Sequence, residues 1–394
     1  MKAVTQGVEQ LENFLSKRAK KSNKRRLGIL CHPSSATRHF EHVQNICERA
    51  GNLTTLFGPQ HGIHGETQDN MIEWQDSKDE RGRPVYSLYG ERRKPKQDSL
   101  NNIDLMIIDL FDVGARYYTF IYTVAYMMEA CAQKGIPIVI CDRPNPLGGQ
   151  LIEGPYLNLD FRSFVGLYRI PICHGLTIGE LALRFASEMD PKPDLRILKL
   201  KNWKRSMHFP ETGLPWTLPS PNMPNYAASL VYPGMCLLEA TSISEGRGTT
   251  RPFELIGAPY LEWDQIEREY LKLSKNLGLE PVIFHRQGFI PTFHKHSGEM
   301  CRGALQFVAR PKKFLPVRHM ALLLWIFRRL YGSQWSWKNP PYEYEYVKAP
   351  IDILSGDSRL RECVDGGHDL RDLFSVWKKD EEDFKKARAE FLLY

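Results

Sequence analysis

The sequence lacks the patterns that identify disulfide-linked, membrane-spanning and secreted proteins. Its eight cysteines are scattered and form no CxxC pair, so neither a disulfide framework nor a zinc site is indicated. No segment approaches the roughly 18 consecutive apolar residues of a membrane span, and the nearest run covers only 320–326. The N-terminus shows no basic region followed by an apolar stretch and a cleavage site. We therefore expect a cytoplasmic protein without a membrane span.

Nucleotide and metal motifs are also missing. No GxGxxG follows the first strand-like run and no GxxxxGK[ST] occurs, which argues against dinucleotide and P-loop nucleotide sites. His61, His64 and His174 stand near acidic residues, but no HExxH or comparable ligand spacing accompanies them. The absence of a Gly-x-Ser-x-Gly elbow weakens an esterase reading. We expect no metal and no cofactor.

The charge is modest for a chain of 394 residues, at +7, and 42% of the residues are hydrophobic. These values are those of an ordinary globular protein with a large core. Much of the positive charge lies in a basic cluster between residues 17 and 26. Such a cluster at a helix end is typical of a solvated face, so no nucleic-acid partner is predicted. The oligomeric state stays open.

Strand-like and helix-like segments alternate in the first part of the chain. Apolar runs at 26–31, 53–57, 103–110 and 136–141 are separated by helical stretches, of which 118–134 ends at Gly135 as at a helix C-cap. This alternation predicts an α/β fold with a parallel, Rossmann-like sheet.

The composition changes after about residue 260. An amphipathic helix is predicted at 264–277, an apolar helix at 319–331 and a charged helix at 380–391, with strands within 282–293 and at 305–308. We predict three parts. They are a basic N-terminal extension at 1–25, a Rossmann-like catalytic domain at 26–262 and a smaller α+β auxiliary domain at 263–394.

Polar loops adjoin several of the apolar runs, which is where ligand-binding loops of such sheets lie. The richest is 244–253, where Glu245, Arg247, Thr249 and Arg251 stand among glycines. Glycines allow close approach of a ligand, and arginines offer forked donors that match a carboxylate or phosphate. Loops of similar composition cover 57–66, 109–118, 142–149 and 219–224.

Seven motifs, most of them in these loops, resemble those of the YbbC-like family of bacterial exo-β-N-acetylmuramidases. They are GPQHG at 58–62, PVYSLYG at 84–90, DVGARYYT at 112–119, DRPNPLGG at 142–149, EGP at 153–155, SPNMP at 220–224 and SEGRGTTRPF at 244–253. Their order and spacing also resemble the family from about residue 26 to the C-terminus. The resemblance implies a two-domain glycosidase that removes β-linked N-acetylmuramic acid from the non-reducing end of peptidoglycan fragments.

One position departs from the family pattern, because Gln60 stands where the family often has a glutamate that is a candidate for catalysis. An amide neither delivers nor accepts a proton as a carboxyl group does. The acid is then another residue, the substrate differs, or hydrolysis is lost. Two alternatives therefore stay open: a non-catalytic sugar or muropeptide binder, and a hydrolase of another carboxylate-bearing small molecule.

Glycosidic cleavage ordinarily needs an acid and a second group that stabilises or attacks the anomeric carbon. The catalytic candidates are Glu66, Glu245, Asp112 and His61, with the substrate's own 2-acetamido group as a possible internal nucleophile. A muramic sugar carries a lactyl carboxylate, for which arginines are natural partners. The predicted substrate-binding residues are Gln60, Arg116, Tyr118, Asp142, Arg143, Asn145, Asn222, Arg247, Thr249 and Arg251.

Overall fold

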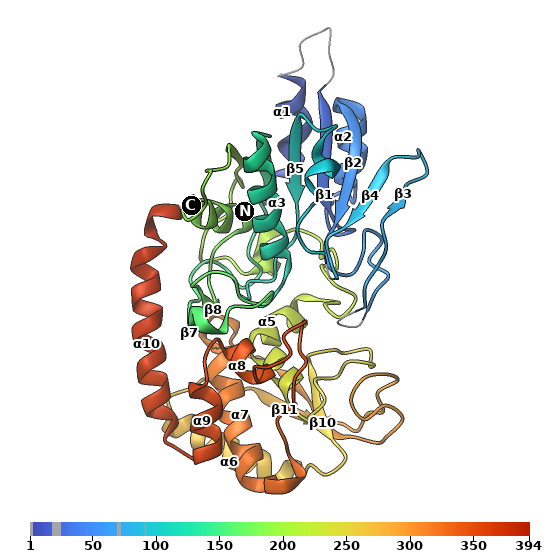
Figure 1. Ribbon diagram of the computed structural model, residues 1–394. Coiled ribbons are helices and arrows are strands. Elements are labelled where there is room, and N and C mark those ends of the chain that lie inside the picture. The colour runs from blue at the N-terminus through green and yellow to red at the C-terminus, as the bar shows by residue number, and fades with distance from the viewer. Residues whose placement is uncertain (1–2, 18–24, 69–71, 91) are drawn as a thin grey trace.

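A computed structural model describes residues 3–17, 25–68, 72–90 and 92–394, and it consists of two lobes (Figure 1). In these described ranges the first lobe contains a seven-stranded sheet in the order β3-β4-β2-β1-β5-β6-β9. All neighbouring strands are parallel except β3 and β4. The bounds are β1 Arg26–Cys31, β2 Asn52–Gly58, β3 Ser77–Lys78, β4 Pro84–Ser87, β5 Leu105–Asp109, β6 Ile138–Cys141 and β9 Leu195–Leu198. The predicted parallel α/β fold is confirmed.

Helices cover both faces of this sheet because successive side chains of its strands point to opposite sides. In β1, Leu27 and Ile29 pack in one apolar cluster with residues of α1 (Leu11–Ser16) and α2 (Val43–Ala50). Leu30 instead joins the cluster that contains the apolar residues of α3 (Phe120–Lys134) and α4 (Ile178–Ala186). The strands are therefore buried on both faces, as their unbroken apolar character predicts.

Local capping signals fix two of these helices. Helix α3 ends at Gly135, which adopts φ 66° and whose N–H donates to the carbonyl groups of Ala132 and Cys131. Helix α4 begins at a capping box, in which the Thr177 side chain accepts from Glu180 N and the Glu180 carboxylate accepts from Thr177 N. The predicted C-cap at Gly135 is confirmed.

The second lobe is a smaller α+β unit around the antiparallel sheet β10-β12-β11, and the two-stranded sheet β7-β8 lies in the segment between β6 and α4. The bounds are β10 Leu255–Ala258, β11 Ile283–Arg286, β12 Arg302–Phe307, β7 Glu153–Tyr156 and β8 Pro171–Cys173. The helices are α5 Tyr226–Met235, α6 Trp263–Asn276, α7 Pro316–Tyr331, α8 Pro350–Ser355, α9 Arg359–Gly366 and α10 Leu370–Ala387. The predicted extent of strand within 282–293 is wrong beyond β11, and the charged terminal helix begins ten residues earlier than the predicted 380.

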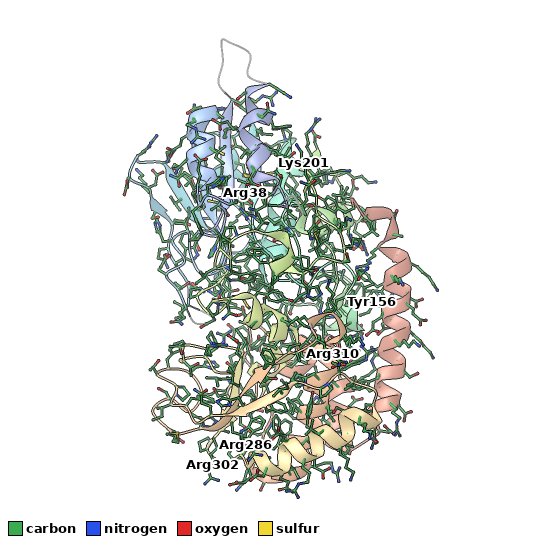
Figure 2. The ribbon with its side chains drawn as sticks, turned by 180° about the vertical axis from the view of Figure 1, so that it is seen from behind. Arg38, Tyr156, Lys201, Arg286, Arg302 and Arg310 are labelled. Carbon is green, nitrogen blue, oxygen red and sulfur yellow. The ribbon has the colours of Figure 1, made fainter. Side chains whose placement is uncertain are left out.

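Helix α10 runs along both lobes and returns the C-terminus to the first one (Figure 1). Tyr156 of β7 lies against this helix in Figure 2, where its ring packs on Phe384 and its N–H donates to the Asp380 carboxylate. At the far end, the Tyr394 hydroxyl donates to Asp142 at 2.6 Å. One apolar cluster extends from β1 to α10, so the two lobes share a core.

The predicted domain boundary near residue 262 stays a prediction, and residues 18–24 of the predicted basic extension lie outside the described ranges. The eight cysteines all lie within the described ranges and are buried thiols. Among the helices that the structure describes, none is both long and apolar enough to cross a membrane.

Candidate active site

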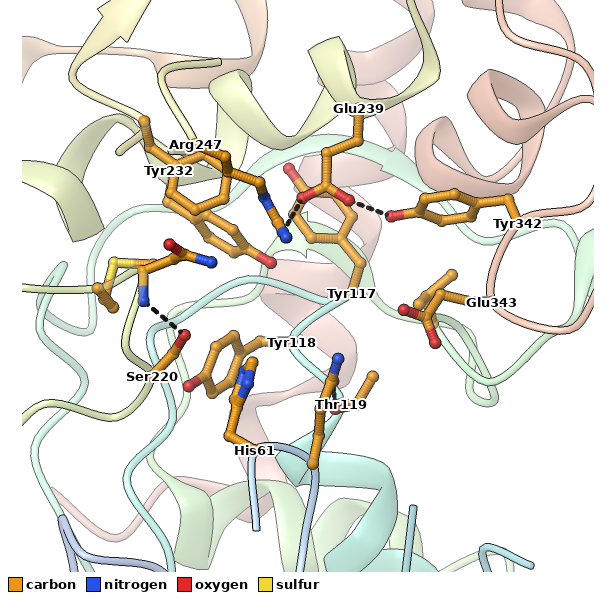
Figure 3. A pocket seen from close by; sticks show the side chains of 15 residues that line it. His61, Tyr117, Tyr118, Thr119, Ser220, Tyr232, Glu239, Arg247, Tyr342 and Glu343 are labelled. Atoms are coloured by element: carbon orange, nitrogen blue, oxygen red, sulfur yellow. Dashed lines mark hydrogen bonds and ion pairs between the residues drawn. The ribbon is translucent and has the colours of Figure 1, made fainter. Parts of the chain in front are cut away.

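A polar pocket lies where the two lobes meet, and Figure 3 shows it from close by. The sheet lobe contributes the loop after β2 and the segment between β5 and α3, because both follow the carboxyl ends of parallel strands. The second lobe contributes segments around α5, β10 and the loop before α8. The lining residues are Gln60, His61, Tyr117, Tyr118, Thr119, Val165, Ser220, Asn222, Met223, Tyr232, Glu239, Arg247, Phe253, Tyr342 and Glu343.

His61 enters the pocket as a neutral imidazole. Its backbone adopts φ 75°, a conformation that non-glycine residues rarely occupy and that is often retained at functional sites. Its Nδ1 lies 2.8 Å from the Thr67 carbonyl oxygen, which can only accept, so Nδ1 carries the proton. Burial lowers the pKa of His61 to about 4, and the charge of Arg247 acts in the same direction. Nε2 therefore has a lone pair and can accept a hydrogen bond from a hydroxyl group.

Glu239 and Arg247 form a buried ion pair on the second-lobe side of the pocket. The Arg247 Nη2 donates to Glu239 Oε1 at 2.7 Å, and the Tyr342 hydroxyl donates to Oε2 at 2.8 Å (Figure 3). The Arg247 guanidinium also lies 5.3 Å from the centroid of the Phe253 ring. A guanidinium and a hydroxyl group thus donate to this carboxylate, and hydrogen bonds between charged groups are stronger than those between neutral ones.

Glu343 is the second buried carboxyl group of the pocket. It lies in the loop before α8 at φ 45°, and the next residue, Tyr344, is also in the left-handed region at φ 65°. Burial raises the pKa of Glu343 to about 7, and the neighbouring charge of Glu239 adds to the rise. A carboxyl group that keeps its proton near neutral pH suits a general acid.

The pocket contains two buried carboxyl groups in different environments. Glu239 has charged and hydroxyl donors, whereas Glu343 holds a proton up to about neutral pH. Pairs of carboxyl groups in such different environments are typical of acid–base catalysis.

Five of the predicted site residues line the pocket, namely Gln60, His61, Tyr118, Asn222 and Arg247. The Tyr118 hydroxyl donates to the Pro219 carbonyl at 2.6 Å, so its ring rather than its hydroxyl is presented to the pocket. Asn222 Nδ2 donates to the backbone carbonyl oxygen of Gln68 at 2.6 Å, and Gln68 Nε2 donates to Asn222 Oδ1 at 3.2 Å. These contacts hold the 219–224 loop against the loop after β2.

Glu245 lies behind the pocket instead of in it. Its carboxylate is fully buried and contacts Lys295 at 2.8 Å, His294 at 3.2 Å and Arg247 at 3.4 Å. Burial alone would raise the pKa of Glu245, but these partners hold it well below its usual value. Its position fits a residue that holds Arg247, and a catalytic role for Glu245 stays an untested prediction.

Four predicted substrate-binding residues are occupied by internal contacts. Arg116 is fully buried and donates to the carbonyl groups of residues 155, 170 and 354. Arg143 pairs with the Asp109 carboxylate, and Asp142 accepts from Gly179 N at the start of α4. Asn145 bridges Leu147 N and the Leu176 carbonyl. Ligand contact by these four residues stays a prediction, and their polar atoms already bond to buried backbone and charged groups.

The remaining predicted residues also lie outside the pocket lining. Asp112 accepts from Gly114 N at 2.9 Å and faces His174 at 3.4 Å. Glu66 is exposed and accepts from His64 N, while Thr249 donates to the Gly246 carbonyl. Arg251 is 47% exposed in its side chain and pairs with Glu254. We do not retain Asp112 or Glu66 as the acid.

The sequence analysis missed Glu239 and Glu343. Glu239 lies just after α5 at the end of an apolar run, so its position resembles the end of a core helix. A single glutamate within the apolar segment 231–240 was nevertheless a signal of a buried charge. Glu343 lies in the segment YEYEY at 342–346, where alternating tyrosine and glutamate resemble a solvated loop. Nothing local in that segment distinguishes Glu343 from Glu345.

Within the described ranges, no group of three or more His, Cys, Asp or Glu side chains is arranged to hold a metal ion.

Comparisons with known proteins match both parts of the chain. Residues 27–227 match the family model for the N-terminal part of the exo-β-N-acetylmuramidase NamZ, and residues 230–394 match the model for its C-terminal part. The peptidoglycan β-N-acetylmuramidase NamZ of Bacillus subtilis (strain 168) is 40% identical over 389 residues, which cover 98% of this chain and 90% of that protein.

Two solved structures of DUF1343 family proteins from Bacteroides fragilis NCTC 9343 share the fold. The first is 30% identical with a TM-score of 0.85 and covers 100% of this chain and 99% of its own. The second is 28% identical with a TM-score of 0.75, and the match covers 99% of both chains. The chain therefore belongs to the family of NamZ-type exo-β-N-acetylmuramidases.

Proposed function

We propose that this chain is a glycoside hydrolase that releases β-linked N-acetylmuramic acid from the non-reducing end of peptidoglycan fragments, with the lobe junction as its active site. The relative of known activity supports the reaction, because it is named a peptidoglycan β-N-acetylmuramidase and matches almost the whole chain. The observation that carries the assignment of the site is the pair of buried glutamates, Glu239 and Glu343, in one pocket.

In the proposed reaction Glu343 is the general acid. Its proton moves to the glycosidic oxygen, the bond between that oxygen and the anomeric carbon breaks, and the electron pair stays on the leaving oxygen. The Glu239 carboxylate stabilises the positive charge that develops on the sugar. Water then adds to the anomeric carbon, and the proton that it releases restores Glu343.

Arg247 is the proposed partner of the lactyl carboxylate. A guanidinium matches a carboxylate through two parallel N–H donors, and Arg247 is the one arginine among the residues that line the pocket in the described structure. The Tyr118 ring and the Asn222 amide are proposed to contact the sugar. Arg116 and Arg251, the other arginines predicted for this role, are engaged elsewhere.

The proposal is tested with two chromogenic substrates that differ in the lactyl group, 4-nitrophenyl β-N-acetylmuramide and 4-nitrophenyl β-N-acetylglucosaminide. We expect the wild type to hydrolyse the muramide with much the higher kcat/KM. Arg247→Met should reduce kcat/KM for the muramide by about 10–100-fold, since a hydrogen bond to a charged group contributes about 1.5–3 kcal/mol. It should affect the glucosaminide less, because on that substrate only the loss of the ion pair with Glu239 acts.

Arg251→Met is the matched control, because this arginine lies in the same 244–253 loop with an exposed side chain. It should leave kcat/KM for both substrates within about twofold of the wild-type values, because surface substitutions usually have small effects. Absence of muramide hydrolysis by the wild type between pH 5 and 8 would overturn the proposed function. Equal loss on both substrates in Arg247→Met would overturn the role of that arginine.

A further inference from the structure

The side chain of Gln60 is bridged to Glu343 through one hydroxyl group. Gln60 Nε2 donates to the Tyr89 hydroxyl oxygen at 3.0 Å, and the Tyr89 hydroxyl donates to the Glu343 carboxyl oxygens at 3.2 and 3.1 Å. At the other end of the amide, Thr119 Oγ1 donates to Gln60 Oε1 at 2.6 Å. The chain of contacts runs from the start of α3 to the second-lobe loop that carries Glu343.

We infer that Gln60 and Tyr89 are positioning residues that orient the Glu343 carboxyl group and stabilise it after it has given up its proton. The inference rests on the proposed function and adds to it two residues that act through Glu343. Both side chains are buried, at 7% and 2% exposure, which keeps water from replacing these hydrogen bonds.

The direction of each hydrogen bond follows from the chemistry of the groups. An amide NH₂ can only donate, so the Tyr89 oxygen accepts from Gln60. A phenol has a single proton, and this arrangement directs it to Glu343. The Thr119 hydroxyl donates to the amide oxygen and so stabilises the orientation in which Nε2 faces Tyr89.

A glutamate at position 60 would reverse this arrangement. An ionised carboxylate has only acceptor atoms, so it would accept the hydrogen bond from the Tyr89 hydroxyl group. Glu343 would then lose that hydrogen bond. It would also add negative charge near Glu343, and like charge disfavours a second ionised carboxylate. In this chain a glutamine at position 60 is therefore compatible with acid catalysis by Glu343.

Other charged and titratable groups also face Glu343. The negative charge of Glu239 raises the pKa of Glu343, whereas the Tyr89 hydrogen bond and the charges of Arg93 and Arg247 lower it. Arg93 also donates from Nη2 to the Glu343 carbonyl oxygen at 3.4 Å and lies over the Tyr344 ring. These groups stay in place when residue 60 or 89 is changed. A shift in Tyr89→Phe therefore reports the lost hydrogen bond, and a shift in Gln60→Glu reports that loss together with the added charge.

The test is the pH dependence of kcat/KM for the chromogenic muramide in the wild type, Tyr89→Phe and Gln60→Glu. The general acid must be protonated, so the rate falls as pH rises through its pKa. Loss of the Tyr89 hydrogen bond should move the basic limb of the pH profile upward by about one pH unit in Tyr89→Phe. The shift in Gln60→Glu should be at least as large, because the added negative charge acts in the same direction. Tyr344→Phe is the matched control, since it removes a neighbouring hydroxyl that donates to Glu73 and not to Glu343. The basic limb of its pH profile should coincide with that of the wild type.

The two proposals fail in different ways. If the wild type hydrolyses the muramide but the limb stays unmoved in Tyr89→Phe and Gln60→Glu, the positioning role is overturned and the proposed function stands. A uniform loss of rate with an unmoved limb indicates a merely structural role and also overturns it. If the wild type does not hydrolyse the muramide at any pH, the proposed function itself fails.

Discussion

Replacing Lys295 by methionine should destabilise the protein strongly, because it leaves the Glu245 carboxylate buried beside weaker partners. Lys295 Nζ donates to Glu245 Oε2 at 2.8 Å and to the carbonyl groups of Leu238 and Ile243 at 2.6 and 2.9 Å. The side chains of Lys295 and Glu245 are 7% and 0% exposed. Methionine has a similar length but cannot donate any of these hydrogen bonds.

Removing one partner of a buried ion pair typically costs about 3–5 kcal/mol, and we expect Lys295→Met to fall in that range. The contacts of Glu245 with His294 and Arg247 remain at 3.2 and 3.4 Å, and they keep the cost from being larger. The double variant Glu245→Gln/Lys295→Met removes both charges. It should be more stable than the sum of the single effects predicts, by about 2–3 kcal/mol.

The assay is urea unfolding of the wild type, the two single variants and the double variant, followed by tryptophan fluorescence at pH 7.

The ion pair of Glu245 with Lys295 also predicts that stability depends on pH. The folded pKa of Glu245 lies well below its ordinary value of 4.5, so its contribution to stability is present above pH 4.5 and is lost as the pH falls below it. Lys295→Met should reduce that acid sensitivity. A cost below about 1 kcal/mol, or single effects that simply add, would refute the reasoning.

Two further predictions concern a buried arginine and the pH dependence of the reaction. Arg116→Met should lower the free energy of unfolding by about 3 kcal/mol or more, because three backbone carbonyl groups lose a buried donor. It should not change KM, because Arg116 lies outside the pocket lining. Urea unfolding and steady-state kinetics measure the two effects, and a raised KM would contradict this placement. In the wild type, kcat/KM should fall as the pH rises through about 7, because Glu343 must be protonated to act as the acid; a rate that stays constant up to pH 9 would contradict that role.

The parts of the fold that depend on local pattern were predictable from the sequence. Apolar runs and the caps at Gly135 and Thr177 define β1, β5, β6, α3 and α4 because short-range hydrogen bonds and side-chain periodicity act within a few residues. Sheets β7-β8 and helices α8 and α9 were not predicted, since they are short and are stabilised by contacts with distant segments.

The site was predictable only where a motif lies at a strand end. Gln60, His61 and Tyr118 follow β2 and β5 and do reach the pocket. Arg116 and Arg143 lie in the same loops but point into the core, and spacing alone does not reveal on which side of a loop an arginine is buried. Glu343 comes from a loop more than 250 residues after Tyr89, so only the folded chain shows that the two residues meet.

The identity of the general acid is tested most directly by comparing the loss of kcat/KM in Glu343→Gln between substrates with different leaving groups. Glu345→Gln is the control from the same loop, and its carboxylate accepts from Val347 N outside the pocket. We expect Glu343→Gln to lower kcat/KM by about 10²–10⁴-fold for N-acetylmuramyl-β-1,4-N-acetylglucosamine, whose leaving sugar needs a proton, and by less than about tenfold for a 2,4-dinitrophenyl muramide, which does not. Equal losses on the two substrates, or no loss on the disaccharide, would contradict the assignment of Glu343 as the acid.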